Sequence, residues 1–208
     1  MRVGLTSGVL AIAIGGLVPP AGANEVSSAK AAEAMVVCES ADLIPAADKA
    51  KKIKRLDEGI AIAEAAVAAD EQDPRAHLAL FCNVGRKLDL SGLSWRVFGE
   101  LRRMQAEVER AQELAPDDPD ILVAKGELLR RVPGPLGGNK ELGRALLLRA
   151  VDVRPDHVAA RLYLARALAD DRDPAARARV NEALAAAKKA GAVREQSEAQ
   201  ELLASLRD

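Results

Sequence analysis

Residue types that carry chemistry in proteins are sparse in this sequence, and their spacing does not suit catalysis. His77 and His157 are the only histidines among 208 residues, and Cys38 and Cys82 are the only cysteines. Neither pair has the spacing of a Cys-x-x-Cys or His-x3-His metal motif, and no Gly-x-Ser-x-Gly elbow for a nucleophilic serine occurs. The sequence therefore predicts a protein without enzymatic activity, cofactor or metal.

The two cysteines lie in segments that we expect to be neighbouring helices. Cys38 and Cys82 would form a disulfide in an oxidising compartment if their Cα atoms came within about 7 Å of each other. Two buried free thiols are the alternative, and the sequence leaves both open.

The N-terminal segment predicts export. An apolar run from Val9 to Val18 is ended by two prolines and followed by Ala21-Gly22-Ala23, a small-x-small cleavage pattern. We therefore expect residues 1–23 to be a signal peptide and residues 24–208 to form one domain in a bacterial periplasm. An uncleaved anchor is the alternative. The run is shorter than the roughly 20 residues of a membrane span, and the mature chain is expected not to span a membrane.

Charge and composition limit the class of partner and the class of fold that the sequence predicts. The chain has 30 basic and 31 acidic residues and a net charge of −1, which argues against a nucleic-acid partner. Hydrophobic residues are 49% of the chain but aromatic ones only 2%, and the former are largely alanine and leucine. These residues favour helices, and no segment alternates like a strand. The composition predicts an all-α fold.

One joint between helices recurs along the chain. Asp73-Pro74 and Asp118-Pro119 each end a short polar turn between the end of one expected helix and the start of the next, and the turn near His157 has a similar position. An aspartate accepts hydrogen bonds from free backbone amides at a helix start, where the missing N–H of proline is no loss. The recurrence predicts tandem helix pairs.

Small and large residues alternate in a fixed pattern around these joints. Leu122-x-x-Lys125-Gly126-x-x-Leu129 fits the first helix of a pair, and Gly143-x3-Leu147-x2-Ala150 and Ala176-x3-Val180-x2-Ala183 fit the second. On these residues the chain resembles the tetratricopeptide-repeat (TPR) family over roughly residues 28–190. The resemblance implies a right-handed superhelix of about four helix pairs, and we expect a capping helix from Glu195 to Arg207 to follow. An unrelated helical bundle is the alternative.

The repeat is longer than the family's in its first copies. Corresponding alanines at positions 66, 111, 150 and 183 give steps of 45, 39 and 33 residues, whereas the family repeats at about 34 residues. The joints keep one length. We therefore expect the additional residues in long turns within pairs, at Arg86–Ser94 and Val132–Asn139.

The second of these turns is the most distinctive segment. Its prolines stiffen the backbone and its glycines permit positive φ angles, while its last residue is suited to cap the next helix. It resembles a turn of exported bacterial TPR proteins, including, more weakly, the T-component of tripartite ATP-independent periplasmic transporters. A structural turn, a partner contact and a phosphate site are the three interpretations. The candidate contacts are Pro133, Pro135, Leu136, Gly137, Gly138 and Asn139.

Half of the aromatic residues follow the first turn. Trp95 and Phe98 lie together there, with several leucines before them. Two interpretations of this apolar cluster are open: it folds back onto neighbouring helices as local core, or it is exposed and forms a docking patch.

In the TPR family the first helices of each pair line a concave face, and the resemblance places charged side chains there. Arg86, Arg130 and Arg166 have similar positions in their helices and would form a row that suits an acidic or carboxylate-ended peptide. A solvated surface of paired charges is the alternative. The concave-face candidates are Arg75, Arg86, Glu127, Arg130, Arg131 and Arg166.

The function expected from these features is binding. The leading hypothesis is a periplasmic protein-interaction module or scaffold that holds a protein or peptide in its groove. The alternative is a solute- or lipid-binding accessory component of a periplasmic transport system.

Overall fold

The computed structural model describes residues 21–90 and 95–206, and the side chains of residues 27–90 and 98–206. Within these residues the predicted all-α fold is confirmed: there are helices and turns and no strand. The α-helices are α1 (Ala21–Ser40), α2 (Lys49–Ala69), α3 (Pro74–Leu90), α4 (Trp95–Leu114), α5 (Pro119–Arg131), α6 (Lys140–Val153), α7 (Val158–Asp170), α8 (Ala176–Ala190) and α9 (Val193–Ser205). Two short 3-10 turns are η1 (Ala41–Leu43) and η2 (Gly134–Leu136).

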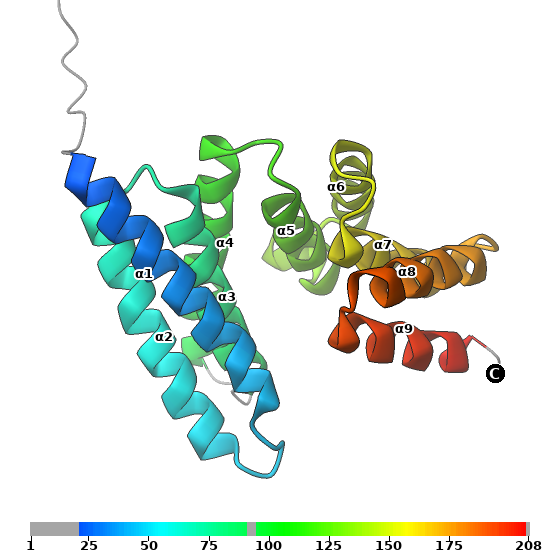
Figure 1. Cartoon of the computed structure of the whole chain (residues 1–208), viewed down its shortest axis with the longest axis horizontal. Coiled ribbons are helices and arrows are strands. Elements are labelled where there is room, and N and C mark those ends of the chain that lie inside the picture. Colours follow the sequence, from blue (N-terminus) through cyan, green and yellow to red (C-terminus); the bar gives the residue numbers. More distant parts are fainter. Residues whose placement is uncertain (1–20, 91–94, 207–208) are drawn as a thin grey trace, which may run out of the picture.

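The helices follow one another in space in the order of the sequence. Each packs on the next, and α1 also packs on α3, α5 on α7, and α7 on α9. Figure 1 shows the resulting array, with α1 and α2 at one end and α8 and α9 at the other.

Small residues bring these helices close together. Alanines in nearly every helix are fully buried, and Gly126 of α5 faces Gly143 of α6 so closely that a Cβ on Gly143 would lie 2.6 Å from the Gly126 carbonyl oxygen. Larger apolar side chains fill the space between them. The largest fully buried ones are Leu56, Val84, Val108, Ile121, Leu122, Leu147, Leu162 and Val180.

The joints between pairs are built as the sequence predicts. The Asp118 carboxylate accepts hydrogen bonds from the amides of Asp120 (2.9 Å) and Ile121 (3.3 Å) at the start of α5. Asp73 accepts from the Arg75 amide at 2.9 Å in the same way. Each joint therefore satisfies the free amides of the helix that it opens.

Helix α1 is attached to α3 by a covalent bond and by polar contacts. Cys38 and Cys82 form a disulfide with a Cα–Cα distance of 6.2 Å. The buried Asn83 amide donates to the Ala34 carbonyl at 2.9 Å, and the buried Ser27 hydroxyl donates to the Asp73 carboxylate at 3.0 Å. The first helix is thus held along its length.

The predicted long turn at Arg86–Ser94 is wrong in most of its length. Helix α3 continues to Leu90, and α4 already begins at Trp95. Leu88 packs on the core, and Arg86 and Lys87 form ion pairs with Asp42 and Asp57, so these residues are stabilised as helix. The additional residues of this repeat mainly lengthen its helices to 17 and 20 residues.

The expected closing helix is present as α9, and one side of it is apolar. Ala199, Leu202 and Leu203 of α9 pack against Leu162 of α7 and Val180 of α8. It begins slightly earlier than expected, at Val193. Its apolar side covers the last core cluster.

Predictions for the N-terminal segment fall almost wholly outside the described residues. Helix α1 begins at Ala21, ahead of the expected mature start at Asn24, and the signal peptide stays a prediction. No helix in the described part of the chain is long and apolar enough to cross a membrane.

Candidate functional site

Every arginine among the concave-face candidates, including the three predicted to form a basic row, is paired with a carboxylate. Arg75 of α3 reaches the next joint, where it lies 2.7 Å from Asp118 and 2.9 Å from Asp120. Arg86 pairs with Asp42 after α1, and Arg131 pairs with Asp89 of α3 at 2.8 Å. These charges join neighbouring helices and do not form a free anion-binding surface.

A further chain of charges reaches from η1 to α9. Arg166 of α7 lies over the Tyr163 ring, 5.1 Å from its centroid, and pairs with Glu198 at 2.8 Å. Arg194 lies 3.7 Å from Glu198 and 3.5 Å from Asp42. The first turn and the last helix of the array are therefore in electrostatic contact.

Arg130 is the clearest correction to the predicted concave face. Only 4% of its side chain is exposed, and its guanidinium forms two parallel hydrogen bonds to Asp171, of 3.0 and 3.1 Å. It also donates to the Ala167 carbonyl at 3.0 Å. Because α5 and α7 pack together, this position on α5 faces the end of α7 and not solvent.

Glu127 is a partly buried carboxylate on the same helix. No described residue forms a hydrogen bond or ion pair with it. Burial raises its pKa to about 7, an effect that the nearby Arg166, Arg131 and Arg130 only partly offset. The folded protein therefore holds Glu127 as a mixture of neutral and ionised forms near pH 7, where an ordinary glutamate is ionised.

Replacing Glu127 with glutamine is expected to stabilise the protein at alkaline pH only. The pKa of Glu127 in the folded protein lies above its ordinary value of 4.5, so protonated Glu127 stabilises the folded state relative to the ionised form. This stabilisation is complete below pH 4.5 and is lost as the pH rises through about 7. Glutamine stays neutral throughout. Urea unfolding should show a free energy of unfolding that is higher in Glu127→Gln than in the wild type by about 2 kcal/mol at pH 8 and by little at pH 4.5. This figure is reduced from the full pKa shift because Glu127 is partly exposed.

The exposed Glu113→Gln exchange on α4 is the matched control for this measurement. It should give the same small difference at both pH values. An equal effect of Glu127→Gln at the two pH values would contradict the prediction.

Both histidines stabilise helix starts and joints. His77 is buried, with Nδ1 2.7 Å from Glu107 and Nε2 3.1 Å from the Glu71 carbonyl oxygen. Burial lowers its pKa, but these partners raise it by more. His157 accepts from the Ala160 amide to cap α7 and lies 2.8 Å from Asp120, whose pKa this contact and Arg75 hold below the usual range. No described group of three or more His, Cys, Asp or Glu side chains could hold a metal ion.

The backbone path of the α5–α6 loop, defined as Val132–Asn139, depends on two glycines and on a helix cap. Gly137 has a φ of +97°, and a Cβ on Gly138 would lie 1.7 Å from the Val132 carbonyl oxygen. Asn139 caps α6, as predicted, by accepting from the Leu142 amide at 2.9 Å. Side chains at the two glycine positions would not be compatible with this turn.

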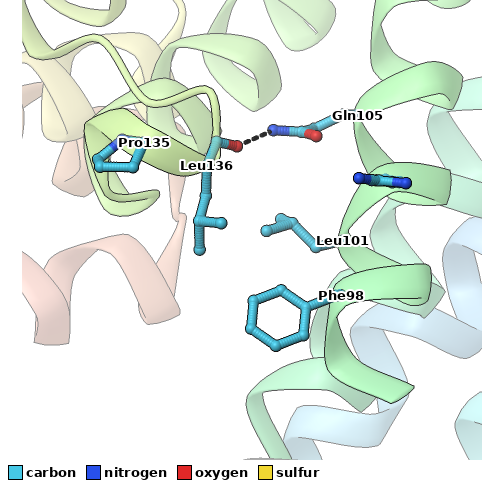
Figure 2. A pocket seen from close by; sticks show the side chains of 6 residues that line it. Phe98, Leu101, Gln105, Pro135 and Leu136 are labelled. Carbon is cyan, nitrogen blue, oxygen red and sulfur yellow. Dashed lines mark hydrogen bonds between the residues drawn. The ribbon is translucent and has the colours of Figure 1, made fainter. Parts of the chain in front are cut away.

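The loop and α4 enclose a pocket, and this pocket is the candidate functional site. Figure 2 shows Leu136 of the loop opposite Phe98 and Leu101 of α4, with Pro135 beyond Leu136 and the Gln105 amide donating to the Leu136 carbonyl at 2.9 Å. The pocket has a volume of about 230 Å³ and also includes Arg102 in its lining. Phe98 is 53% exposed and Leu136 is 39% exposed.

The aromatic segment around Phe98 and the α5–α6 loop, which are separate features of the sequence, therefore meet at this pocket. Phe98, Pro135 and Leu136 line the pocket, whereas Pro133, Gly137, Gly138 and Asn139 shape the turn. The side chain of Trp95 lies outside the described residues. Sequence reasoning missed Leu101, Arg102 and Gln105, although their helical spacing from Phe98 places them on one side of α4.

Neither a protein-family model nor a curated protein matches the sequence. What the chain does is therefore inferred from the pocket and from the polar contacts around it.

Proposed function

We propose that this protein is a non-catalytic, TPR-type interaction module of the periplasm that binds another protein through the pocket between α4 and the α5–α6 loop. The observation that supports this most directly is Phe98, an aromatic side chain that lies 53% exposed beside the pocket. Exposed apolar side chains around a concavity are typical of protein-binding sites.

The construction of the pocket supports a binding role. The loop is stiffened by Pro133 and Pro135 and is hydrogen-bonded to α4 through Gln105. A site that is already formed loses little conformational entropy when a partner binds. An apolar cluster that served only as local core would bury Phe98 and Leu136 more completely.

The repeat assignment rests on the order and joints of the helices. Successive helices pack as neighbours, and the first helices α1 and α3, and α5 and α7, also pack together. Capped joints at Asp73 and Asp118 and the close approach at Gly126 agree with the TPR pattern. Export is supported by the N-terminal sequence and by a disulfide, which is a bond typical of oxidising compartments.

Capture of a partner from periplasmic extract tests the function. The immobilised protein is expected to retain a defined protein, and Phe98→Asp is expected to abolish retention because it places a charge in the apolar wall. Leu148→Asp on α6 is the matched control, since Leu148 is also an exposed apolar side chain, 44% exposed, and does not line the pocket. Mass spectrometry identifies what is retained.

Two results would contradict the proposal. One is an unchanged set of retained proteins on the Phe98→Asp variant, which would exclude the pocket. The other is retention of nothing by the wild type, together with a thermal shift caused by a small carboxylate or a lipid, which would favour a solute-binding accessory.

A further inference from the structure

We propose that the pocket binds a peptide segment of the partner that carries a bulky aliphatic side chain next to an aspartate or glutamate. The aliphatic group enters between Phe98 and Leu136, and the carboxylate pairs with Arg102. This inference rests on the proposed function and specifies the chemistry of the partner.

The walls of the pocket determine the apolar part of this ligand. Four of the six residues that line it, Phe98, Leu101, Pro135 and Leu136, have hydrocarbon side chains. Its volume of about 230 Å³ is below the roughly 300–1,000 Å³ of typical small-molecule pockets. The space admits an inserted aliphatic side chain, and burying one leucine or isoleucine contributes about 1.5–3 kcal/mol before the costs of association.

Arg102 determines the charged part. Most described arginines are paired with a carboxylate, but no described residue forms a hydrogen bond or ion pair with the Arg102 side chain. The helix offers it no partner, because the positions three and four residues away are Phe98, Gly99, Gln105 and Ala106. Glu100 is two residues away and points to another side of α4.

The Arg102 guanidinium therefore has hydrogen-bond donors that no described residue uses, beside the hydrocarbon side chains of the pocket. Arginine binds carboxylates through two parallel hydrogen bonds, as Arg130 does with Asp171 inside this protein. An acidic residue close to the inserted side chain would complete the same arrangement between two proteins. One of the two N–H groups of the Gln105 amide is already used by the Leu136 carbonyl.

A random peptide library displayed on phage tests the inference with the full chain. Selection is performed in parallel on the wild type, Phe98→Asp, Arg102→Glu and Arg110→Glu. Arg110 is the matched control because it lies on the same helix, pairs with Glu113 and does not line the pocket. Peptides that also bind Phe98→Asp are removed.

Wild type and Arg110→Glu are expected to select peptides in which leucine, isoleucine or valine has an acidic residue within three positions. Arg102→Glu is expected to select lysine or arginine at that place instead. For the best synthetic peptide, changing the acidic residue to its amide should weaken binding about fivefold on the wild type and not on Arg102→Glu.

The outcomes separate this inference from the function on which it rests. Aliphatic peptides without acidic enrichment, or an unchanged preference on Arg102→Glu, would overturn the acidic requirement and leave the pocket as a binding site. Selection that does not depend on Phe98 would overturn both.

Discussion

Reduction of the Cys38–Cys82 disulfide is expected to lower the free energy of unfolding by about 4 kcal/mol. The bond closes a loop with a sequence separation of 44, and restricting a loop of that size in the unfolded chain stabilises the folded state by this amount in the chain-entropy model. Domains of this size are stable by only about 5–15 kcal/mol. The reduced protein should therefore unfold at a much lower urea concentration.

Urea unfolding with and without reductant measures this difference. The Cys38→Ala/Cys82→Ala double variant is the control, because its stability should match that of the reduced wild type and should not respond to reductant. Oxidised and reduced proteins that unfold at the same urea concentration would contradict the prediction.

Removing the carboxylate of Asp171 is expected to destabilise the fold by about 3 kcal/mol. It would leave the Arg130 guanidinium, whose side chain is 4% exposed, without its bidentate partner, and an uncompensated buried charge is costly. Asp170, 3.7 Å from the same guanidinium, compensates only in part. Asp171→Ala should lower the urea midpoint accordingly.

The neighbouring pair offers a matched control. Arg131 and Asp89 also form a bidentate ion pair, but the Arg131 side chain is 64% exposed. Asp89→Ala should therefore cost less than about 1 kcal/mol. Combining Asp171→Ala with Arg130→Leu should recover part of the loss, because no charge is then left buried. Equal effects of Asp171→Ala and Asp89→Ala would show that burial of the pair does not matter.

The joints and helix types are predictable from sequence because their causes are local. Asp118 and Asn139 cap helices through amides two or three residues away, so residue type and spacing are sufficient. The extent of α3 was not predictable in this way. Its last residues are stabilised by Asp42 and Asp57, which come from a distant part of the sequence.

The same distinction applies to the candidate site. The distinctive loop and Phe98 are visible as separate features of the sequence, but their proximity depends on how α5 packs beside α4. The predicted exposure of Arg130 is wrong for a related reason. The helical repeat tells which side of α5 Arg130 lies on, but only the position of α7 decides whether that side is buried. Arg102 becomes noticeable only once it is known that no carboxylate among the described residues pairs with it.

The hydrogen bond between Gln105 and the Leu136 carbonyl has a mechanical consequence. The walls of the pocket belong to different helix hairpins, α3–α4 and α5–α6, so the width of the pocket depends on the angle between them. If the proposed segment binds there, it contacts both hairpins at once, and a change in the angle between them would change its affinity.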